Sequence, residues 1–182
     1  MISSPLTLSL ALALGAATTA AGGLAQPQPP QPPEGYQQVT IATAWSAQYV
    51  LQPAAPAQAG SGVVIMSASG GPEQQWYLRE EEGKSTSTRI QLAETELCLD
   101  AGTGRSNGSP LTVADCVEGQ ASQAWLYNAD SQIVLDQTGA QLCADLYMGA
   151  VQDNTRVVIW QCIAGDKNHI WNVANVSTTA TQ

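Results

Sequence analysis

The chain has 182 residues, with 15 acidic and six basic side chains and a formal net charge of −9. A balance this negative argues against nucleic acid as a partner, because nucleic-acid affinity comes largely from Lys and Arg contacts with phosphates. It argues equally against binding to an anionic membrane surface. The length is that of one ordinary domain.

The first 25 residues are typical of a secretory signal peptide. An apolar stretch from Leu6 to Ala17 is followed by small residues up to Ala25, which is the order of regions found in such peptides. The stretch is shorter than the roughly 20 apolar residues that a transmembrane helix needs, so no membrane insertion is expected. We therefore expect the segment 1–25 to be removed and the protein to be secreted and extracellular.

The next segment, residues 26–37, is rich in Pro and Gln and predicts an extended linker. One domain is expected over 38–175, followed by a C-terminal tail over 176–182. From residue 38 onward the pattern is β: short apolar runs are separated by Gly, Asn, Asp and Ser, and no segment keeps a helical period. These runs include residues 88–94, 97–100, 111–116 and 133–137. The acidic run Glu80–Glu82 predicts a solvated turn.

The chain has four cysteines, namely Cys98, Cys116, Cys143 and Cys162. An even number in a secretory context favours two disulfides. Zinc is the competing interpretation, but there is no Cys-x-x-Cys and only one His, so the spacing of a tetrahedral site is missing. We expect no metal and no cofactor.

The chain repeats itself. Residues 97–125 and 142–171 both run Leu-Cys-x-Asp, a polar turn, an apolar strand, a second Cys, a Gly-containing loop, and a Trp nine residues after that Cys. Residues 49–76 keep the apolar strand, the Gly loop and the final Gln-x-Trp, but lack both cysteines and the Asp. Three units that are each too small to bury an apolar face are expected to share one core.

Each unit ends on a similar tripeptide. These are Gln74-Gln75-Trp76, Gln123-Ala124-Trp125 and the variant His169-Ile170-Trp171. Together with the two Cys-x-Asp…Cys units, they resemble the ricin B-type lectin or Gln-x-Trp β-trefoil family over about residues 38–174. The resemblance implies an all-β fold, a β-trefoil of three pseudo-symmetric repeats with twelve short strands, and disulfides that lie within repeats. Repeat symmetry then predicts the pairs Cys98–Cys116 and Cys143–Cys162.

Two neighbouring tryptophans have different expected roles. Trp171 belongs to the set that recurs in every unit, so we expect it in the core. Trp160 has no counterpart, because our alignment places Ala114 and Ile65 at its position. In the family this position carries the aromatic on which a sugar ring stacks, and an indole matches the apolar C–H face of a pyranose. The alternative is that Trp160 is ordinary surface bulk.

The third repeat carries further residues of the family's sugar site. Asp145 stands where the family has its sugar-binding Asp, and Asn168 where it has a hydroxyl-binding Asn, while His169 replaces the usual Gln and Val158 a polar residue. A carboxylate is a strong acceptor for hydroxyl groups. The resemblance therefore implies a carbohydrate site of Asp145, Trp160, Asn168 and His169. Each polar residue also has a structural alternative: the Asp and the Asn suit turns, and the His suits packing.

The other repeats are expected to bind poorly. The second keeps Asp100 and Gln123 but has Ala114 at the aromatic position and Ser122 at the Asn position, which predicts a dead or feeble site. The first has Leu51 at the Asp position in our alignment and is expected to be inert.

These features predict a monomeric lectin with one principal site, and galactose-type glycans lead because they are the family's commonest ligands. An enzyme is not expected, since a Ser-His-Asp triad would need His169 and no G-x-S-x-G motif is present. The main alternative is a β-trefoil protease inhibitor that acts through exposed loops such as residues 52–62. A module that targets a partner enzyme to polysaccharide is a further alternative. Sequons at Asn107 and Asn175 allow glycosylation.

Overall fold

The computed structural model describes residues 32–79, 87–137, 139 and 141–176. The predicted signal peptide, the first part of the linker, the acidic run Glu80–Glu82 and residues 177–182 of the predicted tail lie outside these residues. Within them the protein is all-β, and no helix has the length and apolar character needed to span a membrane.

Twelve of the thirteen strands in the described residues form three successive sets of four. The first set is β1 (Gln37–Thr43), β2 (Ser46–Pro53), β3 (Val63–Ser67) and β4 (Trp76–Leu78). The second is β5 (Gln91–Leu92), β6 (Leu97–Asp100), β8 (Thr112–Asp115) and β9 (Trp125–Tyr127). The third is β10 (Ile133–Leu135), β11 (Leu142–Leu146), β12 (Thr155–Gln161) and β13 (Trp171–Asn175). The remaining strand, β7 (Ser109–Pro110), pairs with β12.

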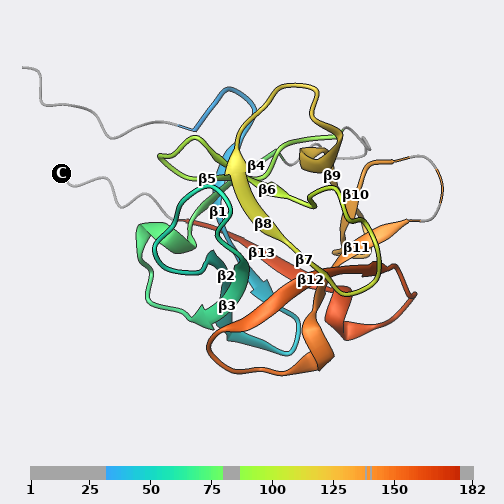
Figure 1. Cartoon of the computed structure of the whole chain (residues 1–182). Coiled ribbons are helices and arrows are strands. Elements are labelled where there is room, and N and C mark those ends of the chain that lie inside the picture. The colour runs from blue at the N-terminus through green and yellow to red at the C-terminus, as the bar shows by residue number, and fades with distance from the viewer. Residues whose placement is uncertain (1–31, 80–86, 138, 140, 177–182) are drawn as a thin grey trace, which may run out of the picture.

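Short 3-10 helices stand at equivalent places. The helices η1 (Pro72–Gln74), η2 (Ala121–Gln123) and η4 (Lys167–His169) each end two residues before a recurring Trp. A further helix, η3 (Tyr147–Gly149), directly follows β11. The three repeats, coloured in turn from blue to red, surround a shared centre (Figure 1). The fold is therefore the predicted β-trefoil.

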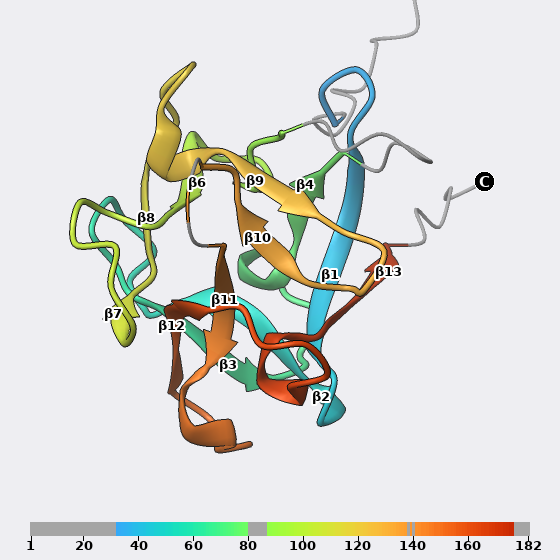
Figure 2. The ribbon, with the colours of Figure 1, turned by 90° about the vertical axis from the view of Figure 1, so that its right-hand side faces the viewer.

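The first and last strands of the described chain pair with each other. Strand β1 pairs antiparallel with β2, with β4 and with β13, and β3 of the first repeat pairs with β12 of the third. Figure 2 shows β1 and β13 side by side, although they lie at opposite ends of the described chain. These pairings join the three repeats into one connected sheet.

Three tryptophans form the centre of the core. Trp76, Trp125 and Trp171 are each 0% exposed, and each donates its indole N–H to a backbone carbonyl. The acceptors are Leu51, Leu99 and Ala144, at 3.0, 2.9 and 3.0 Å. The prediction that Trp171 is a core residue is confirmed, and the repeated hydrogen bond shows why this position needs an indole rather than another large apolar residue.

Both predicted disulfides are confirmed. Cys98 is bonded to Cys116, and Cys143 to Cys162, with Cα–Cα distances of 5.0 and 5.1 Å. Each bond ties a strand of its repeat to the loop that leads to the recurring Trp, so the two loops have the same construction.

The predicted alignment of the first repeat is wrong by one residue. Cys98 faces Ala114 and Cys143 faces Trp160 across their strand pairs. The equivalent pair in the first repeat is Val50 with Met66, so Met66 corresponds to Trp160, and the predicted Ile65 does not.

The Asp position shifts in the same way. The residue that corresponds to Asp100 and Asp145 is Gln52, not the predicted Leu51, which is 1% exposed and belongs to the core. The physical reason is loop length. The aromatic position precedes the recurring Trp by eleven residues in the two disulfide-closed repeats, but by only ten in the first repeat, which has no disulfide to close.

Candidate functional site

The candidate site begins on one face of the β11–β12 pair. Cys143 faces Trp160 and Asp145 faces Val158 in this antiparallel register. Because side chains alternate across a strand, all four project from the same face. Trp160 is thus the diagonal neighbour of Asp145, at a backbone separation of about 7–8 Å, which an indole can bridge.

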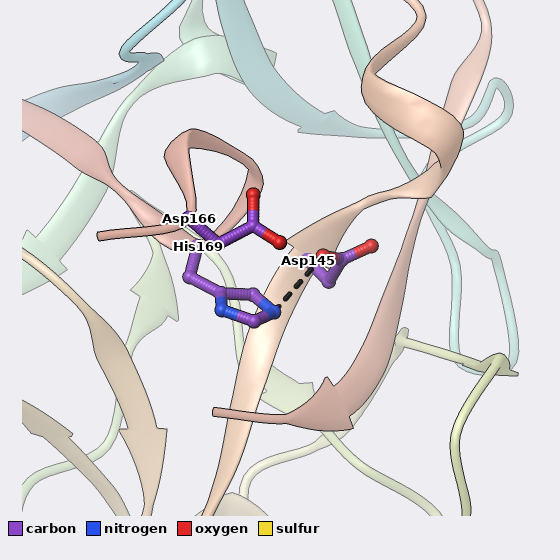
Figure 3. A group of neighbouring side chains, drawn as sticks. All are labelled: Asp145, Asp166 and His169. Atoms are coloured by element: carbon purple, nitrogen blue, oxygen red, sulfur yellow. Dashed lines mark ion pairs between the residues drawn. The ribbon is translucent and has the colours of Figure 1, made fainter. Parts of the chain in front are cut away.

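The carboxylate of Asp145 contacts the buried ring of His169. The His169 ring is 0% exposed, and its Nε2 lies 3.0 Å from Oδ2 of Asp145 in an ion pair that is not aligned as a linear hydrogen bond (Figure 3). The other ring nitrogen, Nδ1, accepts the backbone N–H of Ile163 at 3.2 Å. The ring therefore spans the space between a strand side chain and the loop that follows Cys162.

In the other two repeats a glutamine links the equivalent strand side chain to the equivalent loop. Gln123 donates Nε2–H to Oδ2 of Asp100 at 2.9 Å and accepts the N–H of Val117 at 2.9 Å. Gln74 donates to Gln52 at 2.8 Å and accepts the backbone N–H of Ser69, in the loop after β3, at 2.7 Å. An imidazole with one donor and one acceptor nitrogen can replace a carboxamide here, so the structure places His169 as a buried substitute for Gln.

The carboxylates of Asp100 and Asp145 differ in the hydrogen bonds that their oxygens accept from the protein. In the second repeat, Oδ1 of Asp100 accepts the N–H of Gly102 at 2.6 Å. Its Oδ2 accepts both Ser122 Oγ–H at 3.1 Å and Gln123 Nε2–H at 2.9 Å. Each oxygen therefore accepts at least one hydrogen bond from the protein itself.

Asp145 has spare acceptor capacity. Its Oδ2 pairs with His169, whereas no donor from the described part of the chain reaches its Oδ1. The side chain is 8% exposed, so solvent reaches only a small part of it. A ligand hydroxyl that approaches this carboxylate finds an oxygen with no donor from the described residues, whereas each oxygen of Asp100 already accepts at least one hydrogen bond.

Asn168 is positioned by three neighbours. Asp166 caps η4 by accepting the backbone N–H of Asn168 at 3.0 Å. The side-chain Oδ1 of Asn168 accepts the indole N–H of Trp45 at 3.0 Å, and a Cβ at Gly149 would lie 2.9 Å from the same oxygen. Since an indole nitrogen can only donate, this contact fixes which end of the amide is oxygen. The Nδ2 donors then have no partner among the described residues.

Trp160 lies against the turn that precedes β7. A Cβ at Gly108 would lie 3.7 Å from Cζ3 of Trp160, and the N–H of the next residue, Gln161, donates to Oδ1 of Asn107 at 2.7 Å. The indole is partly exposed, unlike the 0% of Trp171. The first sequon residue, Asn107, is exposed beside it, whereas the second sequon ends at Ser177, outside the described residues.

The sequence model of the ricin-type beta-trefoil lectin domain matches residues 37–171. The chain belongs to this family. Among curated proteins no match was found.

Solved structures share the fold of this lectin domain at low sequence identity. The designed three-fold symmetric protein ThreeFoil has a TM-score of 0.64 at 20% identity, over 76% of this chain and 99% of its own. The Vibrio vulnificus hemolysin/cytolysin beta-trefoil lectin with N-acetyl-D-lactosamine bound has a TM-score of 0.57 at 18% identity, over 78% and 96%.

Longer proteins match only in part. The Polyporus squamosus lectin, solved with Neu5Aca2-6Galb1-4GlcNAc, has a TM-score of 0.62 at 19% identity, over 78% of this chain and 50% of its own. The chain likewise covers 49% of the protein in the PSL1a-E64 complex. It therefore spans about half the length of these two structures.

Chemistry argues against a metal ion at the acidic side of the candidate site. Asp145, Asp166 and His169 have ligand atoms within 4.8 Å of one another (Figure 3). Because Nδ1 of His169 accepts a backbone N–H, the neutral ring is assigned its proton on Nε2. No nitrogen lone pair is then left for a cation, and Asp166 already caps η4.

The pKa of His169 is raised above its ordinary value. Burial by itself lowers this pKa, but the adjacent Asp145 carboxylate outweighs burial and Asp166 adds to the rise. Protonation of Nδ1 would end its hydrogen bond with the N–H of Ile163, so the arrangement with Nδ1 as an acceptor belongs to the neutral ring.

A hollow of about 310 Å³ lies elsewhere on the lectin domain. It is lined from Tyr36 and Arg89 on one side and from the loop of Val117 to Gln120 on the other. None of Asp145, Trp160 and Asn168 lines it. The hollow is therefore separate from the candidate site.

Proposed function

We propose that the chain is a carbohydrate-binding lectin with one working site, in the third repeat. Asp145, Trp160 and Asn168 contact the sugar in this proposal, and His169, which is fully buried, acts through Asp145. The observation that carries it is that Oδ1 of Asp145 has no donor among the described residues, whereas each oxygen of Asp100 accepts at least one hydrogen bond.

The three side chains offer complementary chemistry for a sugar. The Trp160 indole presents a flat apolar surface to the C–H face of a pyranose ring. Asp145 accepts hydroxyl hydrogens through charge-assisted bonds, which are about twice as strong as neutral ones. Asn168 donates from Nδ2 to a hydroxyl oxygen. An acceptor and a donor beside one stacking surface fix both the position and the orientation of a ring.

Galactose-type glycans are the proposed ligands. Galactose or its N-acetylated form occurs in the sugars bound to similar structures, namely N-acetyl-D-lactosamine in the Vibrio vulnificus lectin and GalNAc in the earthworm R-type lectin C-half. A further similar structure is an exo-beta-1,3-galactanase, 30% of which matches this chain. These likenesses support the choice of sugar through the shared family alone.

The protein is proposed to be a secreted monomer without catalytic activity. Two disulfides support an oxidising, extracellular environment. The single His of the chain is buried and engaged with Asp145 and Ile163, so it is not available as a general base for a nucleophile.

A glycan array on the purified full chain tests this function. Selective retention of galactose-terminated glycans is the expected result. Binding to no glycan, with inhibition of a protease, would instead support the protease inhibitor that the sequence left open.

A further inference from the structure

Exposed apolar side chains gather around η4. The large exposed hydrophobic residues of the described chain are Trp45, Val117, Met148 and Ile163, at 48, 51, 81 and 49% exposure. Three of them border this helix. Trp45 bonds to Asn168, Met148 belongs to η3, which packs on η4, and Ile163 donates its N–H to His169. Apolar groups that meet water around a polar site are typical of a ligand-binding surface.

Repeat symmetry does not require an indole at Trp45. The register pairs Thr43 with Trp171, Leu92 with Trp76 and Leu135 with Trp125. The residues two positions later are Trp45, Glu94 and Gln137. Two repeats thus place a polar side chain on a hairpin where the first repeat has a Trp. Like Trp160, and unlike the core tryptophans, Trp45 has no Trp at the equivalent positions of the other repeats.

The indole of Trp45 is held in place by η4. Its N–H donates to Oδ1 of Asn168 at 3.0 Å, and Nζ of Lys167 lies 5.0 Å from the ring centroid. A cation over an aromatic face is an attractive contact. Two anchors and 48% exposure together describe a fixed ring with much of its surface open. A ring fixed in this way loses little freedom when a ligand stacks on it.

The position of Trp45 extends the candidate site in one direction. Oδ1 of Asn168 contacts both Trp45 and the position of Gly149, and η3, which contains Gly149, directly follows β11, the strand that carries Asp145. A glycan ring held by Asp145 and Asn168 therefore has Trp45 as its neighbour beyond Asn168.

We infer that Trp45 is the stacking surface for a second sugar ring, and that the ligand is an oligosaccharide of at least two linked rings. This inference rests on the proposed lectin function of the third repeat. One further aromatic contact predicts that an oligosaccharide binds up to about tenfold more tightly than the single sugar.

Calorimetry with three probes tests the inference. The probes are galactose, N-acetyllactosamine and a β-1,3-linked galactotriose, each titrated into the full chain. Trp45→Gln introduces the residue that the third repeat carries at the equivalent position, so the hairpin is expected to keep its structure. Trp45→Phe keeps an aromatic face and removes the donor to Asn168. A thermal melt of each variant checks folding.

The expected result is that the wild type binds at least one oligosaccharide about tenfold more tightly than galactose. Trp45→Gln abolishes this difference between oligosaccharide and galactose, whereas Trp45→Phe keeps most of it; any loss from the missing hydrogen bond to Asn168 affects all three probes alike. Equal loss of galactose and oligosaccharide binding in Trp45→Gln would overturn the inference, because Trp45 would then act only by positioning Asn168.

Three further outcomes would also overturn it. Equal wild-type affinity for all three probes would remove the second subsite and leave the proposed function standing. Full oligosaccharide affinity in Trp45→Gln would have the same two consequences. Failure of the wild type to bind any probe would remove the proposed galactose-type function and the inference together.

Discussion

Replacing each of two tryptophans by alanine should separate the core from the site. Trp171 is 0% exposed and donates its indole N–H to Ala144 at 3.0 Å. Truncating a buried Trp costs about 3–5 kcal/mol, and the carbonyl of Ala144 also loses its partner. In a domain of this size, that loss lowers the melting temperature by roughly 6–20 °C.

Trp160→Ala should behave differently. Trp160 is partly exposed, and the second repeat already carries Ala114 at this position with an intact strand pair. The loss of unfolding free energy is expected to stay below about 1 kcal/mol. Thermal melts of both variants measure the difference, and Trp125→Ala is the matched core control. Equal losses for Trp160→Ala and Trp171→Ala would refute the separation of site from core.

Three other changes have defined outcomes. His169→Gln should keep the fold. The raised pKa of His169 adds stability that is complete below about pH 6.5 and is lost as pH rises through that pKa. In thermal melts over rising pH, the wild type should therefore lose stability relative to the variant. Parallel plots of melting temperature against pH for the two proteins would contradict this. Gly149→Ala, at φ +63 and against Asn168 Oδ1, should cost about 1–2 kcal/mol in melts and weaken galactose binding severalfold in calorimetry; unchanged affinity would show that Asn168 is not a contact. Replacing Cys98 and Cys116 with Ser should cost about 3 kcal/mol in denaturant unfolding but leave sugar affinity unchanged, and lost binding in a folded variant would place the site elsewhere.

The fold was predictable because its recurring residues act locally. Each recurring Trp follows a short helix and bonds to a carbonyl in its own repeat, so the period along the chain reports the packing. The two disulfides also lie within repeats. The first repeat has no such bond, and a loop shorter by one residue was enough to misplace Leu51 and Ile65.

The site was only partly predictable. Asp145 could be found from its place after Cys143, but its free oxygen depends on contacts that spacing does not reveal. The proposed role of Trp45 was not predicted from the sequence because its partner Asn168 is 123 residues away. The absence of a counterpart in the other repeats was its one sequence signal. The role of His169 depended on which nitrogen faces Ile163, which only the three-dimensional arrangement shows.

The most direct measurement of the central claim is calorimetry with galactose on the wild type, Asp145→Asn and Asp100→Asn. The two variants make the same chemical change at equivalent positions of two repeats. A shallow single site is expected to give a wild-type dissociation constant of roughly 0.1–1 mM. Asp145→Asn should weaken binding at least about tenfold, since hydrogen bonds to a charged group contribute about 1.5–3 kcal/mol, and Asp100→Asn should leave it unchanged. Unchanged binding in a folded Asp145→Asn variant, or equal losses in both variants, would contradict the single third-repeat site.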